Sequence, residues 1–176
     1  MKLTKALLAI VAFALLIPTT DSWAKPTGKS QTRPFKARFS TEFFNESVNS
    51  EFIFTTVVTG SGNATHLGKC SLDAKHLFAF TSPNLDQGIA WNGTLDLGAA
   101  NGDVVNATYE GDIVPSDDPE VPFLLLFTIT FDGGTGRFTN ASGTAEVIGL
   151  TTIEPDLSNG LFKGTSEFIF EGTIAY

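Results

Sequence analysis

The chain has 176 residues, with 19 acidic side chains against 11 basic ones and a formal net charge of −8 at neutral pH. From residue 39 onward, only four basic residues stand against 18 acidic ones. Such a surface repels nucleic acid and anionic lipid, so we expect no nucleic-acid partner. The only cysteine, Cys70, cannot form an internal disulfide and is expected to be a small buried residue.

The first 24 residues have the pattern of a secretory signal peptide. Two lysines precede an unbroken apolar run over residues 6–17, and Ser22 and Ala24 supply the small residues before a cut after Ala24. The apolar run is too short to span a bilayer as a helix. We therefore expect a secreted or periplasmic protein that is not stably inserted in a membrane, with a mature chain that starts at Lys25.

Residues 25–34 are expected to form a flexible basic arm ahead of one domain at 35–176. This short segment is polar, contains Pro and Gly, and has no apolar face to bury. The remaining length fits one domain with a core of its own.

From residue 35 onward, apolar and polar side chains alternate with a period of two, which is typical of strands that bury one face. The inward positions predicted in chain order are Phe35, Ala37, Phe39 and Phe43; Phe52, Phe54 and Val58; Trp91, Gly93, Leu95 and Leu97; Val105, Ala107, Tyr109 and Ile113; Phe123, Leu125, Phe127, Ile129 and Phe131; Phe168, Phe170, Gly172, Ile174 and Tyr176.

Turn-forming residues separate these segments, for example at 60–63, 82–84, 101–103, 132–134 and 158–160. No segment of the expected mature chain has the periodicity of an amphipathic helix. The sequence therefore predicts an all-β fold, an antiparallel closed barrel of about eight strands, because closure removes exposed sheet edges.

Two segments carry a resemblance to a known family. Gly133-Gly134-Thr135-Gly136-Arg137-Phe138-Thr139-Asn140-Ala141-Ser142-Gly143 resembles the glycine signature of the allene oxide cyclase and dirigent-like barrel superfamily, and Ala64-Thr65-His66-Leu67-Gly68 resembles a stretch that exported bacterial members pair with it. The resemblance implies an eight-stranded antiparallel barrel, association into trimers, and in some members a cyclase acting in an apolar cavity. The family's catalytic residues lie outside the glycine motif and match no position here.

The glycine motif has a structural interpretation of its own. Its glycines allow the positive φ angles of a tight, bulged connection, and Arg137 is suited to tie that loop to an acid or a carbonyl. The motif is not a phosphate loop, because the Gly-Lys-Ser/Thr ending is missing and no helix is expected after it.

Four aromatic residues, Trp91, Tyr109, Phe127 and Phe170, are predicted to point inward from four different strands. Rings and one hydroxyl around a closed axis would suit a small, neutral, apolar ligand, whereas plain core packing is the structural alternative. No acid shares these inward faces, so no general acid/base pair is visible. We expect no cofactor.

Other polar groupings point only weakly to chemistry. His66, Cys70 and His76 share a strand parity, but a turn at 71–74 would separate them, so no metal site is expected. The acidic loop containing Asp112, Asp117, Asp118 and Glu120 lacks the spacing of a calcium loop. Asn45, Asn63, Asn92, Asn106 and Asn140 each begin an Asn-x-Ser/Thr sequence, which matters only in a glycosylating compartment.

Three functions therefore stay open. The first is an exported barrel that binds a small apolar molecule or serves a structural role. The second is a cyclase or isomerase that confines a hydrophobic substrate in the same cavity. The third is a small outer-membrane barrel, since the last strand ends on the aromatic residue Tyr176 as such strands do.

Overall fold

The computed structural model describes residues 30–118, 122–156 and 161–176. In these ranges the chain forms eight antiparallel strands and one 3₁₀ turn, η1 (Gly136–Phe138). The strands are β1 (Thr32–Val48), β2 (Phe54–Ala64), β3 (Gly68–Phe80), β4 (Gly88–Ala99), β5 (Val104–Pro115), β6 (Phe123–Gly134), β7 (Ser142–Asp156) and β8 (Leu161–Ala175). No helix in these ranges is long and apolar enough to cross a membrane.

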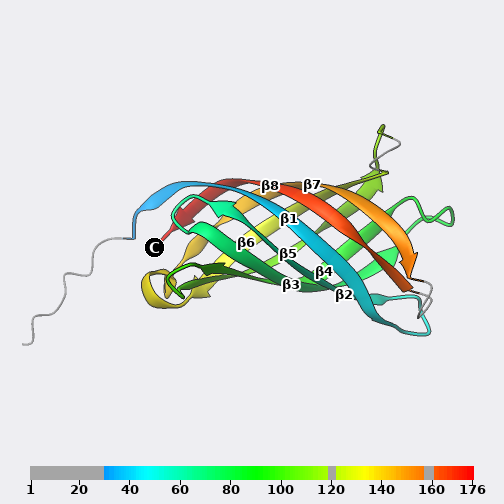
Figure 1. Cartoon of the computed structure of the whole chain (residues 1–176), viewed down its shortest axis with the longest axis horizontal. Coiled ribbons are helices and arrows are strands. Elements are labelled where there is room, and N and C mark those ends of the chain that lie inside the picture. Colours follow the sequence, from blue (N-terminus) through cyan, green and yellow to red (C-terminus); the bar gives the residue numbers. More distant parts are fainter. Residues whose placement is uncertain (1–29, 119–121, 157–160) are drawn as a thin grey trace, which may run out of the picture.

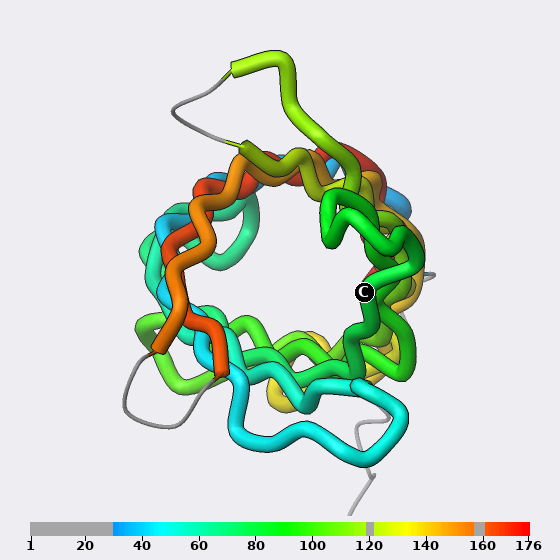
Figure 2. Tube along the Cα trace, turned by 90° about the vertical axis from the view of Figure 1, so that its right-hand side faces the viewer, coloured from blue at the N-terminus to red at the C-terminus, as the bar shows by residue number. Residues whose placement is uncertain are grey.

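Each strand pairs with its neighbours in the sequence, and β1 also pairs with β8, so the sheet closes into a barrel. The closing seam runs from the pair Thr32–Ala175 to the pair Phe44–Lys163. Figure 1 shows β1 and β8 side by side, and Figure 2 shows the strands as a complete ring. The predicted all-β, antiparallel, eight-stranded closed barrel is confirmed.

The barrel begins earlier than the sequence indicated. β1 starts at Thr32, and residues 32–34 are paired with β8 although they were assigned to the flexible arm. The apolar period of two begins only at Phe35, so no pattern in the sequence indicated these first three paired residues. The predicted signal peptide and its cleavage site lie outside the described residues.

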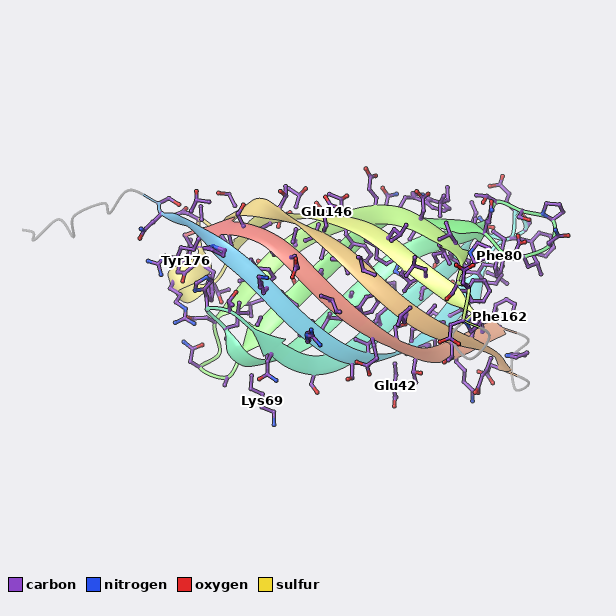
Figure 3. The ribbon with its side chains drawn as sticks, turned by 90° about the horizontal axis from the view of Figure 1, so that it is seen from above. Glu42, Lys69, Phe80, Glu146, Phe162 and Tyr176 are labelled. Carbon is purple, nitrogen blue, oxygen red and sulfur yellow. The ribbon has the colours of Figure 1, made fainter. Side chains whose placement is uncertain are left out.

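Most strands alternate between a buried, largely apolar inner face and an exposed outer face. The burial pattern of β1 from Phe35 to Glu42 is buried and exposed in turn, and β7 shows the same pattern. Glu42, Lys69 and Glu146 project outward in Figure 3. The outer ion pairs Lys36–Glu171 and Lys75–Glu46 are well exposed and contribute little stability.

The end of the barrel that carries η1 is filled with side chains; we call it the packed end. Its largest fully buried residues are Phe35, Leu97, Val105, Phe131, Phe138 and Ile174. The rings of Phe35 and Phe131 meet edge to face at 4.9 Å, and those of Phe138 and Tyr176 do so at 4.8 Å. The C-terminus lies at this end (Figure 1).

Arg137 joins the two segments that carry the family resemblance. Its guanidinium group donates a hydrogen bond to the backbone carbonyl of His66, and its Nε lies 3.7 Å from the Asp103 carboxylate. The same group lies 4.8 Å from the centroid of the Phe138 ring. The predicted role of Arg137, to tie the loop to an acid or a carbonyl, is confirmed, and both partners are present.

The glycine motif contains a position that only glycine fits. Gly134 has a φ of +154°, and a Cβ there would overlap the carbonyl oxygen of Val104. Gly68 also has a positive φ, +71°, but no neighbouring atom lies within 4 Å of the place where its Cβ would be. A side chain at Gly68 would therefore meet backbone strain alone, whereas a side chain at Gly134 would meet both backbone strain and a steric overlap.

We expect Gly134→Ala to lower the free energy of unfolding by more than about 2 kcal/mol, because it adds an overlap to the backbone strain. Gly68→Ala is the control and should cost about 1 kcal/mol, the strain alone. Urea denaturation of both variants measures the difference. Equal losses would show that the approach of Gly134 to β5 is unimportant.

Candidate functional site

The opposite end of the barrel is hollow; we call it the open end. A cavity of about 80 Å³ lies there. Figure 2 views the barrel from this end. Phe80 and Phe162 lie at this end in Figure 3 and are only partly buried. The cavity wall is aromatic and aliphatic except for a few polar side chains, which are Asn45, Thr56, His76, Tyr109, Thr151 and Ser166.

Three of the four predicted site residues line this cavity: Tyr109, Phe127 and Phe170. Trp91 does not. It pairs with Leu77, which lies on the outer face of β3 between the buried residues His76 and Phe78. Because partners across strands share a face, Trp91 is turned outward, where it is half-buried.

A bulge in β4 explains the error at Trp91. The register of β4 with β5 shifts between Ala90 and Gly93, and Asn92 has a φ of +52°. Ala90 and Gly93 both face inward, so the two residues between them leave the alternation. The prediction from sequence assumed regular alternation from Gly93 back to Trp91, and the bulge between Ala90 and Gly93 breaks that alternation.

Gly93 has a second effect, because it makes room for the ring of Tyr109. A Cβ at Gly93 would lie 2.6 Å from both Cδ1 and the carbonyl oxygen of Tyr109. The Tyr109 side chain therefore crosses the inner face of β4 and reaches β3. There its hydroxyl lies 2.7 Å from Nδ1 of His76.

The pair of His76 and Tyr109 is the most polar feature of the cavity and is deeply buried. His76 is 8% exposed and Tyr109 is 9% exposed. Burial lowers the pKa of His76 to about 4, so the imidazole is neutral near pH 7. Burial also raises the pKa of Tyr109 above its ordinary value, so the phenol keeps its proton.

The other polar side chains of the cavity bond mainly to one another and to the backbone. Nδ2 of Asn45 donates to Oγ1 of Thr56 at 2.8 Å, and Oδ1 of Asn45 accepts from the backbone N–H of Phe162. The Ser166 hydroxyl donates to Oγ1 of Thr151 at 2.7 Å, and Thr151 donates to the carbonyl of Thr165. These contacts satisfy buried groups and brace the wall.

The sequence reasoning missed His76 as a cavity residue. It placed a turn at 71–74, whereas β3 runs unbroken from Gly68 to Phe80. His66 lies near the packed end, where its Nε2 is 2.9 Å from the carbonyl oxygen of Pro34. His66 and His76 are therefore at opposite ends of β3, and the described residues contain no group of three His, Cys, Asp or Glu suited to a metal ion.

Two further sequence features take their places in the fold. Of the acidic loop, Asp112 lies on β5 and Asp117 and Asp118 are exposed, while Glu120 lies outside the described residues. Asn45 is 4% exposed and hydrogen-bonded. It could not accept a glycan without opening this end of the barrel.

The chemistry available to the cavity is limited. Among the described residues, no Asp, Glu, Lys or Arg lines it. His76 is a weak base in this setting, and the hydroxyl of Tyr109 is a weak acid. The arrangement is therefore suited to holding a neutral molecule by apolar contact with a few hydrogen bonds.

Comparison of the chain with protein-family models, with curated proteins and with solved structures finds no match. The site is therefore interpreted from its own geometry.

The low pKa of His76 has a consequence for stability. In the unfolded chain the imidazole takes up its proton near pH 6.5, whereas in the folded barrel it does so only near pH 4. The unfolded state therefore binds more protons between these values. The stabilisation that the neutral His76 gives to the folded barrel is fully present above pH 6.5. As the pH falls toward 4, the free energy of unfolding decreases by roughly 3 kcal/mol on this account.

We expect the free energy of unfolding of the native protein to fall more steeply between pH 7 and 4 than that of His76→Phe. Urea denaturation across this range measures the difference. His66→Gln, which changes a histidine that does not line the cavity, is the control and should keep the native slope. Parallel curves for the native protein and His76→Phe would contradict the burial of a neutral imidazole.

Proposed function

We propose that this protein binds a small, neutral, apolar molecule in the open end of its barrel. The observation that carries the proposal is the contrast between the two ends. The packed end is filled by large rings, whereas the open end has a cavity of about 80 Å³ with an almost wholly apolar wall. A concave apolar site with a few placed polar groups is the usual form of a small-molecule site.

Charge favours a neutral ligand. In the described part of the chain, the cavity wall has no cation to pair with an anion and no carboxylate to pair with a cation. The chain as a whole is acidic, so its field would also slow the approach of an anion. Burial of a charged group in this cavity would carry a large desolvation penalty.

An enzymatic role, the cyclase or isomerase alternative, has one supporting observation, the buried pair of His76 and Tyr109. Proton transfer works best when a group's pKa lies near the working pH, and both groups are shifted away from neutrality. The same geometry is well suited to binding. We therefore propose binding as the function.

The faces of the barrel argue against an outer-membrane role. Such barrels turn apolar residues to the lipid and polar residues to the lumen. Here the core is apolar and the outer face carries exposed charges on most strands, among them Glu42, Lys75, Asp96 and Glu146. Four outward apolar residues, Leu126, Ile148, Leu150 and Ile169, form a local patch on β6, β7 and β8.

We expect the chain from Lys25 onward to remain in solution without detergent after ultracentrifugation, because the outer face of the barrel carries exposed charged residues on most strands. Sedimentation with and without a nonionic detergent measures this. Recovery only in detergent would favour the outer-membrane alternative.

Three properties stay predictions: export of the protein from the cell, its relation to a known barrel family, and the association of several copies. The signal-peptide pattern supports export to the periplasm or the medium. The closed eight-stranded barrel and the contact of Arg137 with the carbonyl of His66 support kinship with the allene oxide cyclase and dirigent-like barrels. The outward patch, in which Leu126 pairs with Ile148 and Ile148 pairs with Ile169, supports association of copies.

Binding can be measured with N-phenyl-1-naphthylamine, a neutral dye whose fluorescence rises in apolar surroundings. We expect saturable enhancement with the native protein. Ala74→Phe, which adds a ring to the cavity wall, should weaken the dye's affinity by about tenfold or more, because overfilling a packed site costs 1–3 kcal/mol.

The matched control is Ala79→Phe, which adds the same ring on the same strand. Ala79 pairs with the exposed residue Ile89 and does not line the cavity, so the dye's affinity should not change. Dye binding that is absent in the native protein, or equal in Ala74→Phe, would contradict the proposal.

A further inference from the structure

We propose that the ligand of this cavity carries a carbonyl oxygen, as in a ketone, aldehyde or neutral ester, and that His76 recognises this oxygen through Nε2–H. This inference rests on the proposed binding function and names the chemical class of the ligand. Two observations carry it: Nδ1 of His76 is hydrogen-bonded to Tyr109, and Nε2 has no hydrogen-bond partner among the described residues.

The contact between His76 and Tyr109 fixes which ring nitrogen of His76 carries the proton. The phenol hydroxyl lies 2.7 Å from Nδ1, and Tyr109 makes no other side-chain hydrogen bond in the described part of the chain. A buried hydroxyl hydrogen without an acceptor is costly, so Tyr109 donates and Nδ1 accepts. A neutral imidazole that accepts at Nδ1 must hold its proton on Nε2.

Nε2 has no hydrogen-bond partner among the described residues, although His76 is 8% exposed and lines the cavity. Among the described residues, the side-chain polar atom that is both fully buried and without a hydrogen-bond partner is Oδ1 of Asp86. Nε2 of His76, which also has no partner, therefore keeps some accessible surface. Its hydrogen is therefore accessible from the cavity. A ligand that enters without an acceptor would leave this donor unpaired and dry.

Thr56 provides a second donor beside the first. It faces His76 directly across the pairing of β2 and β3, so the two side chains are cross-strand neighbours. Its oxygen accepts from Asn45 at 2.8 Å, which leaves the hydroxyl hydrogen free to donate. Two donors on one side of an apolar cavity match a carbonyl oxygen, which has two lone pairs and no hydrogen.

The test uses two ligands of nearly equal shape, 2-octanone and 2-methyl-1-octene, which differ by an oxygen in place of a CH₂ group. Their affinities are measured by displacement of the naphthylamine dye. The ratio of the two affinities is compared between the native protein and His76→Phe, because the hydration of the ligands cancels in this comparison. We expect the ratio to fall by about tenfold in the variant, the effect of one buried hydrogen bond.

The control is His66→Gln, which removes a histidine near the packed end that does not line the cavity; its ratio should stay at the native value. If His76→Phe leaves the Tyr109 hydroxyl unpaired and fails to fold, the double change His76→Phe with Tyr109→Phe removes both polar groups and keeps both rings. The double variant should show the same fall in ratio.

The outcomes separate the two proposals. Binding of both compounds with the same ratio in the native protein and the His76 variant would overturn the carbonyl inference and leave the apolar binding function in place. If neither compound nor the dye binds the native protein, both proposals fail. A tenfold fall confined to the His76 variants would support both.

Discussion

The pairing of β1 with β8 closes the sheet, and every other property of the molecule depends on this seam. Without it, both strands would expose unpaired backbone groups, and the inner faces would not converge. The seam continues without a break from Thr32–Ala175 to Phe44–Lys163. Once the ring is closed, the volume inside is fixed by strand number and tilt. The side chains then decide where that volume is filled. Phe35, Phe131 and Phe138 fill one end. At the other end the rings of Phe54, Phe78, Phe80 and Phe162 pack against one another beside a cavity of about 80 Å³.

The packed end and the open end have complementary roles. At the packed end, Arg137 holds the glycine loop against the turn at His66, and the ring of Phe138, the last residue of η1, is fully buried. At the open end the wall is mostly apolar, and its polar side chains are hydrogen-bonded along the sheet except at Nε2 of His76 and the hydroxyl hydrogen of Thr56. Tyr109 reaches His76 only because Gly93, on the strand between them, has no side chain. One missing Cβ therefore gives the cavity its polar corner, and the neutral state of His76 follows from the burial of that corner.

Much of the fold could be predicted because one-sided burial leaves a period of two in the sequence, and residues such as Phe123 to Phe131 display it clearly. The features that could not be predicted depend on register. The bulge at Asn92 has no apolar signature, so Trp91 was assigned to the wrong face. His76 lies within a strand that looked interrupted at 71–74, and its partner Tyr109 is 33 residues away. Only the pairing of β3, β4 and β5 brings the two together. Gly93 was a visible signal, since a glycine inside a strand often marks a close approach.

The claim that one end of the barrel is hollow and apolar can be tested most directly with crystals of the chain from Lys25 onward held under xenon gas. Xenon binds in dry apolar cavities without needing a hydrogen bond. We expect a xenon site at the open end, surrounded by Leu125, Phe127 and Phe168, and none among the rings of the packed end. Crystals in which the open end is filled by protein side chains and takes up no xenon would contradict the interpretation of this barrel as a binding protein.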